Sequence, residues 1–166
     1  MKHLILIRHA KSDWGYDRPD HDRPLNARGR GAATAIGAWL HDNGHLPDEV
    51  LCSTSARTRE TLTLLGTHAP TRLERALYHA APDTMLQLLQ SAQGNNVMLL
   101  AHNPGIAALA KALVRTAPDH PRFDAYPTCA TLVAHFDIDT WKDLQPGTGT
   151  AHAFIVPRDL TDRPTP

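Results

Sequence analysis

The chain has 166 residues, the size of one domain with a substantial core, and we predict a single domain over residues 1–166 with a frayed polar end from residue 157. Its 17 basic and 17 acidic residues cancel, which argues against nucleic acid or an anionic membrane as a partner. Cys52 and Cys129 stand far apart in apolar sequence, as expected for reduced thiols in a cytoplasmic protein. No apolar run approaches the roughly 20 residues of a membrane span.

Strand-like and helix-like segments alternate from the N-terminus onward. Apolar runs predict buried strands at residues 4–7, 49–52, 95–102, 129–138 and 151–157. Between them, apolar periodicity and capping residues predict helices at 27–44, with Asn26 as N-cap, and at 56–66, 82–92 and 105–115. Residues 11–25 and 73–80 are expected to be linkers. This order predicts a three-layer α/β/α sandwich around a mostly parallel sheet, with the last strands antiparallel at one edge.

Charged side chains follow three of the predicted strands. Arg8 and His9 come directly after the first strand, Arg57 lies in the first turn of the helix after the second, and His102 ends the strand that precedes the last helix. Because parallel strands bring their carboxyl ends to one edge of a sheet, we expect these four residues to converge there.

Two arginines and two histidines at one edge form a natural receptor for a phosphoryl group. Guanidinium groups donate forked, charge-assisted hydrogen bonds to phosphate oxygens. A neutral imidazole can also attack phosphorus and pass the phosphoryl group to water, and fixed cations supply most of the stabilisation in such a transfer. The histidines show no HExxH spacing and no partner cysteines, so we predict no metal and no cofactor.

Four motifs in order resemble the histidine phosphatase superfamily, with its phosphoglycerate mutase-like fold. The stretch RHAKSDW resembles the RHG signature in its small bacterial branch, the SixA-type phosphohistidine phosphatases. The stretches DRPLNARGRGAA, VLCSTSARTRET and LLAHNPG continue the resemblance over most of the chain.

The resemblance implies a role for each matching residue. His9 would be the phosphorylated nucleophile, Arg8 and Arg57 the phosphate clamps, and His102 the second histidine at the phosphoryl oxygens. Ser12 matches a serine of the signature region and Arg23 belongs to the RPL motif, so either could line the mouth of the pocket as a substrate-binding residue.

The chain departs from the family where ester-cleaving members carry an acidic proton donor. The corresponding stretch reads ALYHAAPDTM, in which Asp83 looks like a helix cap and His79 is a substitute to consider. An alcohol leaving group needs a proton at departure, whereas a phosphorylated imidazole can be protonated beforehand. The missing acid therefore favours phosphohistidine on a protein, such as a histidine-containing phosphotransfer domain.

Two other functions stay open at this point. The chain could be a phosphatase of small phosphoesters, in which case the partner is a small phosphorylated molecule. It could also be a non-enzymatic module that binds phosphate or carries a phosphoryl group on a histidine.

Overall fold

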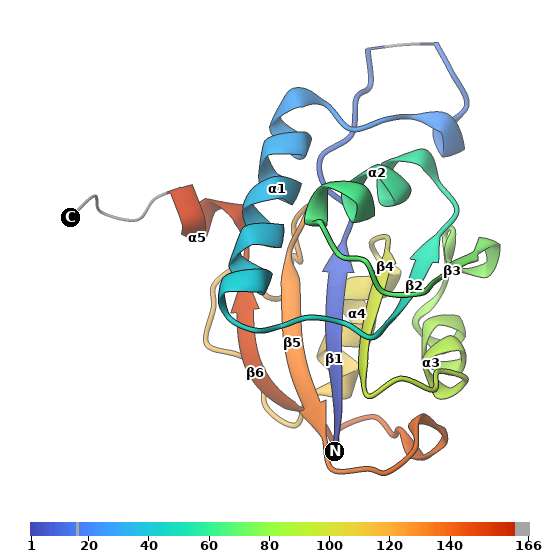
Figure 1. Cartoon of the computed structure of the whole chain (residues 1–166), viewed down its shortest axis with the longest axis vertical. Helices are drawn as coiled ribbons and strands as arrows, with labels where there is room; N and C mark the ends of the chain where they lie inside the picture. Colours follow the sequence, from blue (N-terminus) through green and yellow to red (C-terminus); the bar gives the residue numbers. More distant parts are fainter. Residues whose placement is uncertain (16, 162–166) are drawn as a thin grey trace.

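A computed structural model describes residues 1–15 and 17–161, and its centre is one six-stranded sheet (Figure 1). The strands lie in the order β3-β2-β4-β1-β5-β6. Their bounds are β1 Lys2–Arg8, β2 Glu49–Ser53, β3 Thr71–Glu74, β4 Asn96–Ala101, β5 Thr131–Phe136 and β6 Thr150–Ile155. The first four strands along the chain are mutually parallel, β5 is antiparallel to β1, and β6 is antiparallel to β5. The predicted sheet, including its antiparallel edge, is therefore confirmed.

Helices cover both faces of the sheet, which completes the predicted three-layer sandwich. The helices are α1 Ala27–Asp42, α2 Ala56–Leu65, α3 Pro82–Gln90, α4 Gly105–Leu113 and α5 Pro157–Thr161, with short 3-10 turns η1 Asp20–Asp22, η2 Arg75–Leu77 and η3 Trp141–Asp143. In Figure 1, α1 and α2 lie in front of the sheet and α4 lies behind it.

Alternating side chains of each central strand feed two hydrophobic cores. In β1, Leu4 and Leu6 pack with residues of α3 and α4, whereas Ile5 and Ile7 pack with residues of α1 and α2. Burial on both faces explains why this strand reads as a continuous apolar run. It also makes β1 a rigid mount for the residues that follow it.

The helix starts follow local capping chemistry. The Asn26 side chain accepts a hydrogen bond from the Gly29 amide at 2.8 Å, as predicted, and the Ser55 side chain accepts one from Thr58 at the start of α2. These caps fix where each helix begins, and α2 begins one residue before Arg57.

Two segments differ from the sequence prediction. The stretch 73–80, expected to be a linker, contributes to the edge strand β3 and to η2; the exposed side chains of β3 give it no apolar alternation to detect. The predicted frayed end is wrong for Pro157–Thr161, which form α5, and the rest of it, residues 162–166, lies outside the described residues.

Both cysteines, Cys52 and Cys129, are buried and free. Within residues 1–15 and 17–161, no helix has the length and apolar character needed to cross a membrane.

Candidate active site

The three strand exits meet at one edge of the sheet. The parallel register pairs Arg8 with Ala101, so the residues that follow β1 and β4 are neighbours, and the His9 amide donates to the Ala101 carbonyl at 3.1 Å. The rings of His9 and His102 lie 5.1 Å apart, measured between centroids. The parallel sheet thus brings the two histidines together as expected.

His9 is buried and held in one orientation. Its Nδ1 lies 2.7 Å from the Ala10 carbonyl oxygen, so Nδ1–H donates and the lone pair stays on Nε2, an assignment that follows from the partners. Burial lowers the pKa of His9 to about 3, helped by Arg57 and Arg8 and opposed by the Ala10 hydrogen bond. At neutral pH the ring is therefore uncharged, and its Nε2 lone pair can accept a hydrogen bond.

Arg57 stands between the two histidines in the first turn of α2. Its Nε donates to His9 Nε2 at 3.3 Å, and its Nη2 lies 3.4 Å from His102 Nδ1. The backbone carbonyl and the carboxylate of Asp20 hold the outer side of the guanidinium, at 2.8 and 3.2 Å. The Arg57 side chain thus contacts both imidazoles and is held in place by Asp20.

A hydroxyl of α2 links the backbone next to His9 to this arginine. Thr61 Oγ1 donates to the Arg57 carbonyl at 2.7 Å and accepts from the Ala10 amide at 3.0 Å. Thr61 is completely buried. The backbone next to His9 and the first turn of α2 are therefore joined through one side chain.

His102 is oriented from the opposite side by Ser53. The His102 Nε2 lies 2.8 Å from Ser53 Oγ, and because Arg57 can only donate to Nδ1, Nε2–H is the donor to the serine. Burial lowers the pKa of His102 to about 3, with contributions from His9 and Arg57. Ser53 ends β2, and its role in orienting a histidine carries no signal in the sequence.

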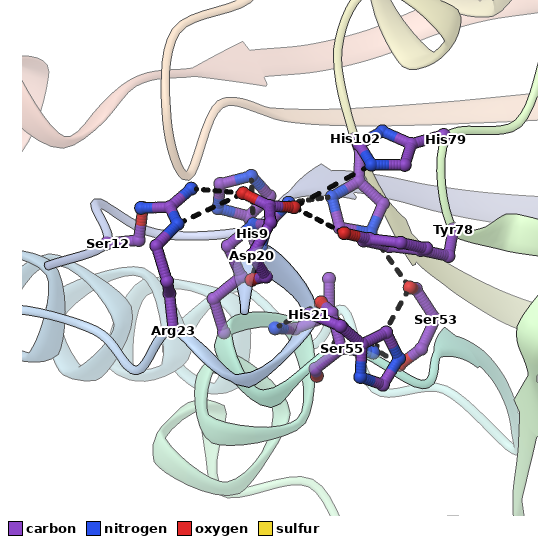
Figure 2. A network of polar contacts seen from close by, with 12 residues as sticks. His9, Ser12, Asp20, His21, Arg23, Ser53, Ser55, Tyr78, His79 and His102 are labelled. Atoms are coloured by element: carbon purple, nitrogen blue, oxygen red, sulfur yellow. Dashed lines mark hydrogen bonds and ion pairs between the residues drawn. The ribbon is translucent and has the colours of Figure 1, made fainter. Parts of the chain in front are cut away.

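Asp20 is the residue of this site that the sequence analysis missed. It lies in η1, and Figure 2 shows its carboxylate surrounded by side chains from distant parts of the chain. Tyr78 donates to its Oδ2, and Arg23 donates to its Oδ1 at 3.0 Å. Burial favours the neutral acid, but the hydrogen bonds from Tyr78 and Arg23 and the charge of Arg57 outweigh it and hold the pKa of Asp20 well below its usual range.

Ser12 and Arg23 are joined to each other at the mouth of the site. The Arg23 Nη1 donates to Ser12 Oγ at 2.7 Å, and the Arg23 guanidinium carbon lies 3.4 Å from the centre of the exposed Trp14 ring. Arg8 lies on another side, where its Nη1 donates to the Tyr126 carbonyl at 3.2 Å.

A cavity of about 350 Å³ opens over His9. All six residues predicted for the site line it: Arg8, His9, Ser12, Arg23, Arg57 and His102. The other lining residues are Lys11, Trp14, Asp20, His79, Asn103 and Thr128.

Of the two proton donors considered from sequence, the structure places one at the cavity. His79 lines it with Nε2 3.7 Å from Asp20 Oδ2, whereas Asp83 is exposed in the first turn of α3 and does not line it. Across the described ranges, no group of three or more His, Cys, Asp or Glu side chains is placed to hold a metal ion.

The balance of charge in the cavity favours an anion. Arg8, Lys11, Arg23 and Arg57 face a single carboxylate, that of Asp20, among the described lining residues. Fixed guanidinium groups beside a neutral imidazole form an arrangement suited to phosphoryl transfer.

Comparison with known proteins agrees with this chemistry. Residues 4–80 match the family model of the histidine phosphatase superfamily, branch 1. An uncharacterised protein of Mycobacterium tuberculosis is 36% identical over 160 residues, which span 92% of this chain and all of that protein.

Solved structures show the same fold over nearly the whole chain. A protein from Nakamurella multipartitia assigned as the phosphohistidine phosphatase SixA is 33% identical, with a TM-score of 0.79 over 93% of this chain and 95% of that one. The protein histidine phosphatase SixA in complex with tungstate superposes with a TM-score of 0.77 at 21% identity, over 95% of this chain and 99% of that one.

The order of the motifs, the sheet that unites them and the near-complete overlap with these relatives lead to one conclusion: the chain belongs to the histidine phosphatase superfamily, in its SixA-type branch.

Proposed function

We propose that this phosphatase hydrolyses phosphohistidine on a protein, through a phosphohistidine intermediate formed on His9. The observation that carries the proposal is the state of Asp20, the one carboxyl group among the described residues that line the cavity. Its hydrogen bonds from Tyr78 and Arg23 keep it ionised, so it has no proton to give at neutral pH. An alcohol needs that proton as it leaves, whereas a phosphohistidine imidazole carries its own and leaves neutral.

In the first step, His9 Nε2 attacks phosphorus. A new N–P bond forms on His9 as the N–P bond of the substrate breaks, and the substrate imidazole departs with the proton already on its other nitrogen. Nδ1–H of His9 stays on the Ala10 carbonyl, which stabilises the positive charge that develops on the ring.

Arg57 and Arg8 are proposed to hold the phosphoryl oxygens during this step. Arg57 Nε–H donates to His9 Nε2 at 3.3 Å, and in the proposed step it turns from that nitrogen to an oxygen of the bound phosphoryl group, which leaves the Nε2 lone pair to attack. The Arg8 Nε–H is buried without a hydrogen-bond partner in the described part of the chain and is available as a further donor. We assign Arg23 and Ser12, which are bonded to each other, to the mouth of the pocket as substrate-binding residues.

His102 would change protonation state when substrate binds. Its lowered pKa keeps it neutral at pH 7, but a phosphoryl dianion next to its ring favours the imidazolium, which donates from both nitrogens. Ser53 would keep accepting from Nε2–H, and Nδ1–H would turn to a phosphoryl oxygen.

In the second step, water attacks the phosphorus of phosphorylated His9. The P–N bond to His9 breaks and its electron pair returns to Nε2, while the proton of the water leaves with the phosphate or passes to solvent. Neutral His9 and inorganic phosphate are the products. Because fixed cations supply the charge stabilisation, we propose that no cofactor takes part.

The partner we propose is a phosphoprotein in the cytoplasm, such as a histidine-containing phosphotransfer domain. One observation favours small phosphoesters as a second candidate. His79 lines the cavity with its Nε2 3.7 Å from Asp20 Oδ2, so an imidazole stands where it could pass a proton to an alcohol leaving group.

Turnover of matched substrates tests the proposal. We expect kcat/KM on a histidine-phosphorylated phosphotransfer domain to exceed that on p-nitrophenyl phosphate and on sugar phosphates by about a hundredfold or more, since esters lack a built-in proton. Equal or greater efficiency on esters would contradict the preference for phosphohistidine, and His79→Gln should then lower ester turnover specifically. Stoichiometric uptake of phosphate without turnover would instead identify a carrier module.

A further inference from the structure

A second cavity, lined by cations and called the groove below, opens beside the active site; among its described lining residues, Arg8 alone has a role in the chemistry proposed above. Its volume is about 470 Å³, larger than the cavity over His9. Five cationic side chains line it: Arg8, Lys11, Arg28, Arg122 and Arg158. No carboxylate is found among the described residues of its lining. The chain as a whole carries no net charge, so this concentration of one sign is local.

Four of the five cations of the groove, all but Arg8, make no polar side-chain contact of their own within the described residues. Within residues 1–15 and 17–161, no ion pair or side-chain hydrogen bond involves the Lys11, Arg28, Arg122 or Arg158 side chain. Neighbouring acids are engaged elsewhere: Asp124 pairs with Lys111 at 3.7 Å. Asp159 likewise lies 2.9 Å from His120 Nε2 and accepts from the Val156 amide. Arginines that stabilised the fold would be expected to pair with such acids.

The groove is continuous with the cavity over His9. Arg8, Lys11 and Thr128 line both. Arg8 stands at the boundary, where its Nη1 is held by the Tyr126 carbonyl and its buried Nε–H has no partner among the described residues. A molecule whose phosphoryl group sits at His9 can therefore extend past Arg8 into the groove.

We propose that the groove binds an acidic segment of the phosphoprotein substrate, next to the phosphorylated residue; the proposal rests on the function proposed above. Its outer cations are spread over three elements, with Arg28 on α1, Arg122 in the segment between α4 and β5, and Arg158 on α5. One phosphate group would need them focused on a point, as Arg57 and Arg23 are at Asp20. Several carboxylates spaced along a peptide of the substrate would match the separated positions of these three arginines.

The walls between the cations fit a polypeptide as well. Ala32, Pro127 and Val156 contribute apolar surface to the same lining. A peptide segment presents both acidic side chains and apolar atoms, whereas a small polyphosphate presents only charge. Complementary charge of this kind raises the association rate and selects among partners.

The test compares two histidine-phosphorylated peptides that differ only in flanking residues, glutamates in one and glutamines in the other. For the unaltered protein we expect kcat/KM to be about tenfold higher on the acidic peptide, chiefly through KM, and the advantage to shrink as salt rises from 0.05 to about 0.5 M. In the triple variant Arg28→Gln, Arg122→Gln, Arg158→Gln, the ratio of the two kcat/KM values should fall to about one.

Arg115→Gln serves as the matched control, because it also removes an exposed arginine but lies after α4, where its amide bonds to Gly149 near the start of β6. It should leave the ratio unchanged. Equal kcat/KM on both peptides in the unaltered protein would overturn the groove proposal while leaving phosphohistidine hydrolysis intact. Turnover of neither peptide, with turnover of p-nitrophenyl phosphate, would instead contradict the proposed function. A small bisphosphate that inhibits the unaltered protein and not the triple variant, without peptide discrimination, would assign the groove to small polyanions.

Discussion

The two halves of the active site are built in different ways. The inner wall, formed by His9, Ser53, Arg57 and His102, stands on strand ends and on the first turn of α2, and no more than 7% of any of its residues is exposed. The rim, formed by Trp14, Asp20, Arg23, Tyr78 and His79, comes from irregular segments; Trp14 is 76% exposed and the His79 side chain 64%, whereas Arg23 is buried.

This difference suggests that the inner wall governs the reaction itself and that the rim governs which substrates are accepted. Buried groups on rigid elements keep His9 Nε2 and the Arg57 guanidinium at fixed distances, as the proposed phosphoryl transfer requires. Groups on exposed segments meet the leaving group and its surroundings. We therefore expect substitutions in the inner wall to affect all substrates alike, and substitutions in the rim to affect substrates differently.

The largest effect is expected for His9→Ala. Without the nucleophile no intermediate forms, so kcat should fall by about a thousandfold or more on every substrate, with the thermal unfolding midpoint as a check on the fold. Labelled substrate should leave an acid-labile phosphoprotein in the unaltered chain and none in the variant. Turnover that survives in His9→Ala would contradict the covalent mechanism.

Acid should destabilise the inner wall before it affects the rim. His9 and His102 have pKa values of about 3 in the folded protein and an ordinary value near 6.5 when unfolded, so the unfolded chain binds more protons between these limits. The contribution of these two neutral histidines to the free energy of unfolding is therefore complete above pH 6.5 and is lost as the pH falls toward 3. Between pH 7.5 and 5, each should lower the free energy of unfolding by about 2 kcal/mol.

Urea unfolding of His102→Gln and His41→Gln measures this contribution. Replacing the buried His102 should reduce the loss of stability over that pH range by about 2 kcal/mol. His41→Gln replaces a histidine whose side chain is 77% exposed and serves as the surface control. An unchanged loss in His102→Gln would mean that this ring is not held neutral.

Two glycines of α1 test how closely this helix packs against Lys11, in the segment that leads from His9 to the rim. A Cβ at Gly29 would clash with the backbone of Lys11, where the chain leaves the nucleophile, whereas a Cβ at Gly31 meets nothing within 4 Å. Gly29→Ala should therefore destabilise the protein by about 1–3 kcal/mol and weaken substrate binding. Gly31→Ala should stabilise it by up to about 1 kcal/mol. Denaturant titration of the two variants measures both changes in the free energy of unfolding. Equal effects would show that α1 does not pack closely against the Lys11 backbone.

The smallest effect is expected for Asp20→Asn. The carboxylate competes with a bound anion for Arg57 and Arg23, so its neutralisation should tighten competitive inhibition by inorganic phosphate about fivefold. Weaker inhibition would indicate that the main role of Asp20 is to hold Arg57 in place. Inhibition constants with one substrate at fixed pH distinguish the two outcomes.

Sequence reasoning was effective where function follows from sheet geometry. Arg8, His9, Arg57 and His102 follow or flank apolar runs, and the parallel order of those runs is enough to predict that they meet. Their roles as nucleophile and clamps stay predictions until turnover is measured.

The rim could not be predicted in the same way. Asp20 acquires its surroundings from Arg23, Tyr78 and Arg57, and Tyr78 lies 58 positions further along the chain in a segment without apolar periodicity. Such contacts depend on how irregular segments close over the sheet. Ser53 is similar, since nothing in its neighbours indicates that its hydroxyl faces His102 across 49 positions.

The buried hydroxyl of Thr61 has a consequence for how such a protein can change over evolutionary time. It ties the backbone beside His9 to the backbone of Arg57, so α2 cannot move away from the end of β1 without breaking a buried hydrogen bond. The exposed positions of α2, such as Arg59 and Thr63, make no such link and are free to vary. Sequence drift on the outer surface of the helix therefore leaves the distance between His9 and Arg57 intact.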